Sequence, residues 1–151
     1  SAIFADYDDD GKVDIFVTVN GQQVEDGQGN NIFDPNQGRG ILFHNETKSN
    51  NNWLKVRIEG TKSNRDGFGA TVRITAGTVK YEQALVSGQG YFSAHAKEIY
   101  FGLGSIESID NISVSWPSGI DQTFNKIPVN QTVYIVEGET LHQNTLFLSI
   151  K

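Results

Sequence analysis

The chain has 151 residues, of which 37% are hydrophobic and 20% are charged, and this composition predicts one globular domain with a core. A formal net charge of -6 argues against a nucleic-acid or anionic-membrane surface, no apolar run reaches the length of a membrane span, and the lack of cysteine excludes disulfides, a thiol nucleophile and a cysteine-ligated metal. Methionine is also absent and the chain begins at Ser1 directly before a motif, so we expect it to be covalently part of a longer multidomain protein.

The first predicted element is an acidic loop that leads into an apolar strand. Residues 5–19 read ADYDDDGKVDIFVTV, and the aspartates have the pattern D-x-D-x-D-G-x-x-D. Oxygen ligands at alternating positions of such a loop suit Ca²⁺, and the glycine permits the sharp turn that brings them to one centre. The spacing predicts a calcium site whose ligands are the carboxylates of Asp6, Asp8, Asp10 and Asp14 and the backbone carbonyl of Lys12. The alternative is a solvated acidic turn with side-chain caps.

A polar, glycine-rich segment follows at residues 20–40. Its length leaves two interpretations open: a floppy excursion, or a binding loop whose carboxylates and amides reach a ligand or a second cation. Ile32 and Phe33 are the residues that could fix its middle to the body of the protein.

The rest of the chain alternates apolar and polar residues with a period of two, which is typical of strands. The clearest runs are residues 54–58, 72–75, 99–103, 112–116 and 133–137, and glycine-rich turns separate them. No window supports a long amphipathic helix. The predicted fold class is all-β, an antiparallel β-sandwich or a partly closed barrel with an N-terminal calcium-binding loop. We expect Trp116 to be buried, and Phe-Gly-Leu-Gly at 101–104 to lie in the core where another backbone crosses closely.

Several motifs resemble known families. They are WLKVR at 53–57, SNRDGFGA at 63–70, GQGYFS at 88–93, FGLG at 101–104 and WPSG at 116–119. In this order they resemble the ASPIC/UnbV domain, the C-terminal module of cartilage acidic protein-like proteins, over about residues 52–138, and the acidic loop resembles the calcium loop of FG-GAP/VCBS repeats. The resemblance implies an extracellular, non-catalytic module of the kind that usually follows a β-propeller of FG-GAP repeats. A single calcium loop cannot form a propeller, so we expect it to be fused to the sandwich.

This interpretation gives one compact β domain over residues 1–151. Residues 1–47 hold the FG-GAP-like loop and the long polar segment, and residues 48–138 form the ASPIC/UnbV-like sandwich. Residues 139–151 continue past the family pattern, and we expect an additional C-terminal strand there, over residues 145–150.

The predicted ligand-binding residues each lie in or beside a glycine-rich turn or on the polar side of a strand: Trp53, Arg65, Asp66, Tyr91 and His95. The Trp and Tyr rings could stack on sugar rings, and the arginine could pair with a carboxylate or sulfate of an acidic glycan. The competing interpretation packs Trp53 beneath a loop, lets Arg65 and Asp66 close a turn, and gives the histidine a structural role.

Enzyme motifs are missing from the sequence: it contains no nucleophile elbow, no zinc-binding histidine motif and no phosphate-binding glycine loop, so we expect no enzyme. We expect a secreted, calcium-stabilised binding module whose ligand is a polysaccharide or oligosaccharide. The alternative is a protein-interaction or adhesion module of the cell surface or matrix. Stacking aromatic residues in a polar groove would favour the carbohydrate, and a broad apolar patch would favour the protein partner.

Overall fold

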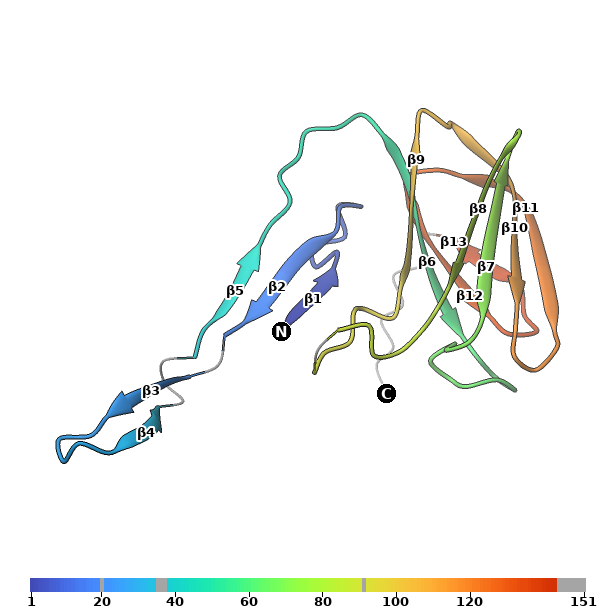
Figure 1. Ribbon diagram of the computed structural model, residues 1–151. Helices are drawn as coiled ribbons and strands as arrows, with labels where there is room; N and C mark the ends of the chain where they lie inside the picture. Colours follow the sequence, from blue (N-terminus) through green and yellow to red (C-terminus); the bar gives the residue numbers. More distant parts are fainter. Residues whose placement is uncertain (20, 35–37, 91, 144–151) are drawn as a thin grey trace. The chain divides into compact units, whose positions relative to one another are not determined.

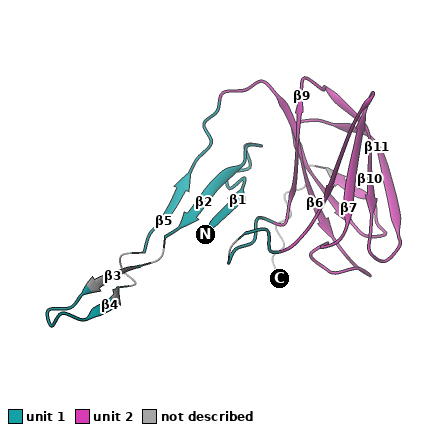
Figure 2. Cartoon of the chain, in the orientation of Figure 1, with its two compact units in different colours: residues 1–47, 88–96 teal, residues 48–87, 97–151 magenta. Residues whose placement is uncertain are grey.

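A computed structural model describes the chain except for residues 20, 35–37, 91 and 144–151. The described residues form strands and turns without a helix, which confirms the all-β prediction (Figure 1). They accordingly include no helix that is long and apolar enough to cross a membrane. The chain divides into two compact units, coloured teal and magenta in Figure 2: unit 1 consists of residues 1–47 and 88–96, and unit 2 of residues 48–87 and 97–151.

The boundary between the units lies between residues 47 and 48, where the sequence separates the acidic N-terminal part from the sandwich. Residues 88–96, which carry the GQGYFS motif, group with the N-terminal residues because they bond to the first strand. The hydroxyl of Ser93 donates to the carbonyl of Ala2 over 3.1 Å, and the N–H of Ala96 donates to the carbonyl of Phe4 over 3.1 Å. That the whole chain forms one domain remains a prediction.

In unit 1, the residues that the structure describes form five short strands in two antiparallel sheets. They are β1 (Ala2–Ala5), β2 (Asp14–Thr18), β3 (Gln22–Glu25), β4 (Asn31–Asp34) and β5 (Gly40–Phe43). The first sheet has the order β1-β2-β5, and β3 pairs with β4 as a separate hairpin (Figure 1). The apolar centre of β2 explains its central place, since Phe16 pairs with Ile3 on one side and with Leu42 on the other.

The described residues of the polar segment at 20–40 thus form a hairpin, and its role as a binding loop remains a prediction. The hairpin turn is organised by Asp26, whose carboxylate accepts the N–H groups of Gln28 and Asn30 over 2.9 Å each. These bonds, first among them the one from Asn30, lower the pKa of Asp26. Ile32 is 47% exposed, so it does not fix the hairpin to the body, and the side chain of Phe33 lies outside the described part of the structure.

The described residues of unit 2 form eight strands in two four-stranded sheets (Figure 1). Their bounds are β6 (Asn52–Glu59), β7 (Thr71–Ala76), β8 (Val79–Ala84), β9 (Ile99–Gly104), β10 (Ser108–Ser115), β11 (Asp121–Pro128), β12 (Gln131–Val136) and β13 (Leu141–Gln143). One sheet has the order β11-β10-β7-β8 and the other the order β13-β12-β6-β9. The predicted strand at 145–150 lies outside the described residues, although β13 begins within the expected C-terminal extension.

Two details of the predicted architecture need correction. The β13-β12-β6-β9 sheet is mixed, because β6 and β12 run parallel with Leu54 opposite Gln131 and Glu59 opposite Val136. A fully antiparallel arrangement is therefore wrong, and the period-two pattern could not have revealed it, since side chains alternate in the same way in both directions. None of the sheets formed by the described residues closes into a barrel, so of the two predicted architectures the sandwich holds.

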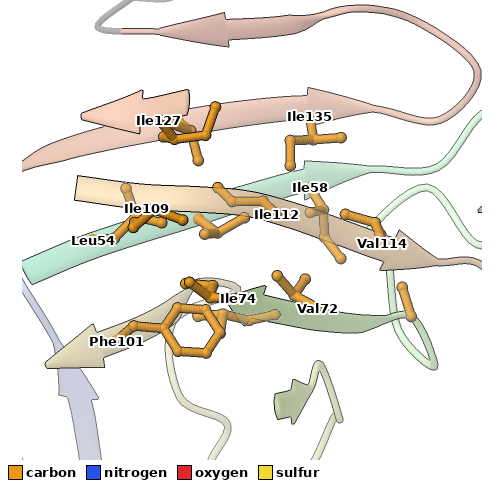
Figure 3. Close-up of a cluster of buried hydrophobic side chains, with 14 of the residues drawn as sticks. Leu54, Ile58, Val72, Ile74, Phe101, Ile109, Ile112, Val114, Ile127 and Ile135 are labelled. Carbon is orange, nitrogen blue, oxygen red and sulfur yellow. The ribbon is translucent and has the colours of Figure 1, made fainter. Parts of the chain in front are cut away.

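The core of unit 2 is filled by alternate residues from both of its sheets (Figure 3). Its fully buried members include Leu54, Val56, Val72, Ile74, Ile112 and Val114. Complete burial of such a side chain contributes about 1.5–3 kcal/mol. Trp116 is 4% exposed, as predicted, and its indole N–H donates to the side-chain oxygen of Gln122 over 2.6 Å.

The FGLG motif lies in this core, but not because another backbone crosses it. Phe101 and Leu103 are each 2% exposed, which confirms the predicted burial. Apart from the two flanking residues, no atom of the described chain lies within 4 Å of the position that a Cβ would take at Gly102 or Gly104, so the expected close crossing is wrong. Gly104 instead has a φ of 59°, a left-handed conformation that favours glycine at the end of β9.

Candidate functional site

The acidic loop joins β1 to β2 within unit 1 and folds round its own carboxylates. Asp6 accepts the N–H of Asp10 at Oδ1 over 3.0 Å and the N–H of Gly11 at Oδ2 over 3.1 Å. Asp10 accepts the N–H of Lys12 at Oδ1 over 2.8 Å. Positive φ values of 59° at Asp9 and 85° at Gly11 supply the turns. The loop therefore closes on itself through the spacing that the sequence shows.

Two overlapping groups of possible metal ligands result. Oxygen atoms of Asp6, Asp8 and Asp10 lie within 4.8 Å of one another, and ligand atoms of Asp8, Asp14 and His44 do the same. Asp8 belongs to both groups, whereas Asp14 groups with Asp8 and His44 and not with Asp6 and Asp10. Carboxylate oxygens are the ligands that hard cations such as Ca²⁺ prefer, so the donor set fits the predicted ion. His44 adds a nitrogen, which such a cation does not need.

Lys12 contributes its ammonium group to the loop. Its Nζ contacts the carboxylate of Asp10, and this hydrogen bond lowers the pKa of Asp10 and raises the pKa of Lys12. The ammonium supplies positive charge to a set of carboxylates that would otherwise repel one another. A cation in the loop would compete with Lys12 for Asp10. The ligand role of the Lys12 carbonyl remains a prediction.

Asp14, the first residue of β2, ties the loop to the sheet. It is 2% exposed, and burial alone would raise its pKa. The N–H groups of Asn45 and Tyr7, at 2.8 and 3.2 Å, and the ring of His44 outweigh burial and lower the pKa. Tyr7 lies in the loop and Asn45 follows β5. The ionised carboxylate of Asp14 therefore joins the acidic loop to the segment after β5.

In unit 2, a buried carboxylate holds the loop between β6 and β7. Glu137 directly follows β12 and is 1% exposed. Its Oε2 accepts the N–H groups of Thr61, Lys62 and Ser63 over 2.8, 2.7 and 2.7 Å, and its Oε1 accepts the hydroxyls of Ser63, over 2.8 Å, and of Ser118. Burial would raise the pKa of Glu137, but the hydroxyl of Ser118 and the other donors lower it to about 2.

The same loop carries two predicted ligand residues. The side chain of Arg65 is 86% exposed, and its Nε lies 3.5 Å from Oε1 of Glu59. Asp66 accepts a hydrogen bond from Nζ of Lys97 over 2.7 Å, and that ammonium also lies 5.9 Å from the ring centre of Phe68. Exposed ion pairs of this kind contribute little to stability, so these charges remain available for a ligand.

Trp53 lies away from these two residues. It stands near the start of β6, whereas the loop with Arg65 follows its end, and at ~3.3 Å per residue the strand separates them by roughly 20 Å. Its backbone exchanges hydrogen bonds with Asn130, over 3.0 Å from the Trp53 N–H and 2.7 Å to the Trp53 carbonyl. The structure thus brings Arg65 and Asp66 together and does not add Trp53 to them.

The other two predicted ligand residues belong to residues 88–96. His95 lies in unit 1, where its Nδ1 accepts the N–H of Phe4 over 3.3 Å. The two rings meet edge-on with centroids 4.9 Å apart, which gives His95 a structural part at β1. Tyr91 lies outside the described residues.

Comparison with known families assigns the second part of the chain. The model of the family described as ASPIC and UnbV matches residues 60–142, which is more than half of the chain. The chain belongs to the ASPIC and UnbV family. The matched stretch of this ASPIC and UnbV protein begins with the loop that Glu137 holds and ends within β13, and it leaves out the acidic loop and the WLKVR motif. No curated protein matches the chain at a significant level.

Sequence reasoning missed three residues of these sites. His44 and Asn45 reach Asp14 only because β5 pairs with β2, and no local pattern in the sequence gives that pairing. Glu137 has a weak signal, since it is an acidic residue that ends an alternating apolar strand directly before Gly138. Its position is typical of an exposed turn, and its burial depends on donors that arrive from distant loops.

Proposed function

We propose that this ASPIC and UnbV protein is a non-catalytic, calcium-stabilised binding module of a secreted protein, and that it binds carbohydrate carrying acidic groups. One observation carries the proposal: Arg65 presents a side chain that is 86% exposed on a loop whose backbone is bonded to the buried Glu137. A loop that is already ordered loses little conformational entropy when it binds, and loops on a rigid β scaffold are common recognition sites.

The charges round this loop favour an acidic glycan. The net charge is -6, yet Lys62 and Arg65 lie in the loop and Lys97 contacts its residue Asp66. A guanidinium pairs bidentately with a planar carboxylate, and the ammonium groups suit sulfate. Phe68, beside Lys97, adds an apolar surface of the kind that packs against a sugar ring.

The calcium part of the proposal rests on the converging carboxylates of unit 1 and on their resemblance to an FG-GAP/VCBS calcium loop. The proposed ligands of one Ca²⁺ are Asp6, Asp8, Asp10, Asp14 and the carbonyl of Lys12. When bound, the ion supplies positive charge between β1 and β2, and the chain's own hydrogen bonds hold the carboxylates in place. The proposed role of the ion is structural, because its ligand Asp14 accepts hydrogen bonds from Tyr7 in the loop and from Asn45 after β5.

Binding to immobilised sulfated and uronic-acid polysaccharides, in calcium-containing buffer, tests the function. Arg65→Ala is expected to weaken binding at least about tenfold, the loss of one charge-assisted pair. The matched control is Arg73→Ala, which removes an arginine of the other sheet that pairs with Glu82. Added salt should weaken wild-type binding. A wild type that binds none of these polysaccharides, or two variants with equal losses, would contradict the proposal.

The alternative, a protein-interaction or adhesion module, is favoured by a different observation. In unit 1, Phe16, Ile41, Leu42 and Phe43 are 39, 42, 45 and 55% exposed. Apolar side chains gathered on one small sheet are typical of a surface that another protein covers. If neither the wild type nor Arg65→Ala bound any of these polysaccharides, the result would favour this alternative.

A further inference from the structure

The two edges of the β1-β2-β5 sheet differ in how their backbone groups are satisfied. At β1, the carbonyl of Ala2 accepts the hydroxyl of Ser93, the carbonyl of Phe4 accepts the N–H of Ala96, and the N–H of Phe4 donates to His95. Residues 93–96 therefore close this edge.

The opposite edge, β5, is open. Hydrogen-bonded and non-bonded pairs alternate along an antiparallel ladder. The N–H of Val19 donates to the carbonyl of Arg39 over 2.9 Å, so the same alternation turns the N–H and C=O groups of Gly40 and Leu42 away from β2. Within the described part of the chain, these outward groups have no hydrogen-bond partner.

The side chains of β5 match this open edge. The strand reads Gly-Ile-Leu-Phe, and each of its four residues is exposed. It contains no lysine, no proline and no bulge, which are the devices that usually prevent strand pairing at an edge. An edge with free hydrogen-bonding groups and apolar side chains on both faces binds another extended strand.

We propose that β5 pairs antiparallel with β5 of a second copy of this chain, across a two-fold axis at Ile41, so that two three-stranded sheets become one six-stranded sheet. In this register Gly40 of each copy lies opposite Leu42 of the other. The N–H and C=O groups of both residues then form reciprocal hydrogen bonds, as an isologous contact requires.

The residues on either side of the axis favour a second copy as the occupant. The Phe16 ring lies over Gly40, because an added Cβ at Gly40 would come within 2.7 Å of the ring. Leu42 of the other copy, opposite Gly40, therefore contacts the Phe16 ring of the first copy. Arg39 lies opposite the Phe43 ring of the other copy, a favourable cation–π pairing. No like charges oppose each other between residues 39 and 43, so the strand is complementary to itself.

Cysteine cross-linking tests the axis directly. The chain has no cysteine, so an introduced thiol reports on one position. Ile41→Cys places two thiols opposite each other at a non-hydrogen-bonded pair, where Cα atoms are about 4.5 Å apart and a disulfide can form. The control is Val19→Cys, because Val19 is 48% exposed in the same unit and lies outside β5. We expect mild oxidation to give covalent dimers with Ile41→Cys and not with Val19→Cys.

Leu42→Pro tests the hydrogen bonds. Proline removes an N–H that points outward, so the pairing of β5 with β2 keeps its donors. Leu42→Val retains the N–H and is the matched control. Loss of two hydrogen bonds per dimer should weaken dimerisation roughly 30-fold, measured by sedimentation across a dilution series. The proposal is overturned if the wild type stays monomeric and the two cysteine variants cross-link equally slowly. That result is expected if the strand of another protein occupies β5. A dimer that survives Leu42→Pro overturns it as well.

Discussion

Replacing Glu137 by glutamine tests whether a single buried charge fixes the loop that carries Arg65. Glutamine keeps the size of the side chain and one carbonyl oxygen. That oxygen can still accept the three N–H groups of residues 61–63, and its NH₂ group can face the hydroxyls of Ser63 and Ser118, which can turn to accept. The substitution therefore removes the negative charge and leaves the geometry almost intact.

The size of the effect comes from the pKa of Glu137, which the folded chain lowers from an ordinary value of 4.5 to about 2. That difference corresponds to about 3 kcal/mol of stability at pH 7. The folded-state pKa is the lower one, so this stability is fully present above pH 4.5 and is lost as the pH falls toward 2. Glutamine cannot ionise and lacks the contribution at every pH.

Urea unfolding of wild type and Glu137→Gln, at pH 7 and at pH 3, measures the difference. We expect the variant to be less stable by about 3 kcal/mol at pH 7 and by roughly 1.5 kcal/mol at pH 3. Glu139→Gln is the control, because Glu139 is exposed and its neutralisation should change stability by less than ~0.5 kcal/mol. A loss that is the same at both pH values, or below about 1 kcal/mol at pH 7, would refute the reasoning.

Two other predictions concern the acidic loop and the turn after β6. EDTA should lower the melting temperature of the wild type relative to calcium buffer, because a cation bound only by the folded chain stabilises it. Asp8→Asn should remove most of that difference. Identical wild-type melting curves in EDTA and in calcium would contradict the site. Gly67→Ala should cost about 3 kcal/mol and Gly77→Ala about 1 kcal/mol in urea unfolding. Both have positive φ, 74° and 59°, but only at Gly67 would a Cβ lie 2.6 Å from the side chain of Ile58, so equal losses would rule out the packing argument.

Several strands of unit 2, among them β7, β10 and β12, could be predicted because they bury alternate residues. In β6, Leu54, Val56 and Ile58 are buried in the core and Arg57 is exposed, as the period of two in the sequence predicts, whereas Lys55, on the same face as Arg57, is also buried. The sequence does not show in which direction the neighbouring strand β12 runs. Residues of β12 alternate in the same way whether the strand runs with β6 or against it, so the parallel pair had no signature.

The candidate sites divide along the same line. The convergence of Asp6, Asp8 and Asp10 follows from local spacing, because one loop of fixed turns brings them together. His44 lies thirty positions from Asp14 in the sequence and contacts it only through strand pairing. Contacts of this second kind depend on the tertiary fold, and a single sequence does not contain the pairing that creates them.

The separation of Trp53 from Arg65 has a geometric cause that bears on the ligand surface. A residue near the start of a strand and a residue in the turn after it lie at opposite ends of the sheet, so glycine-rich turns gather in two sets and not one. Glu137 identifies the set to which Arg65 belongs, because its carboxylate bonds both to Ser63 in the loop after β6 and to Ser118 in the turn after β10. The β10–β11 turn therefore lies beside the loop that carries Arg65, and we expect the residues that extend the proposed ligand site there instead of at Trp53.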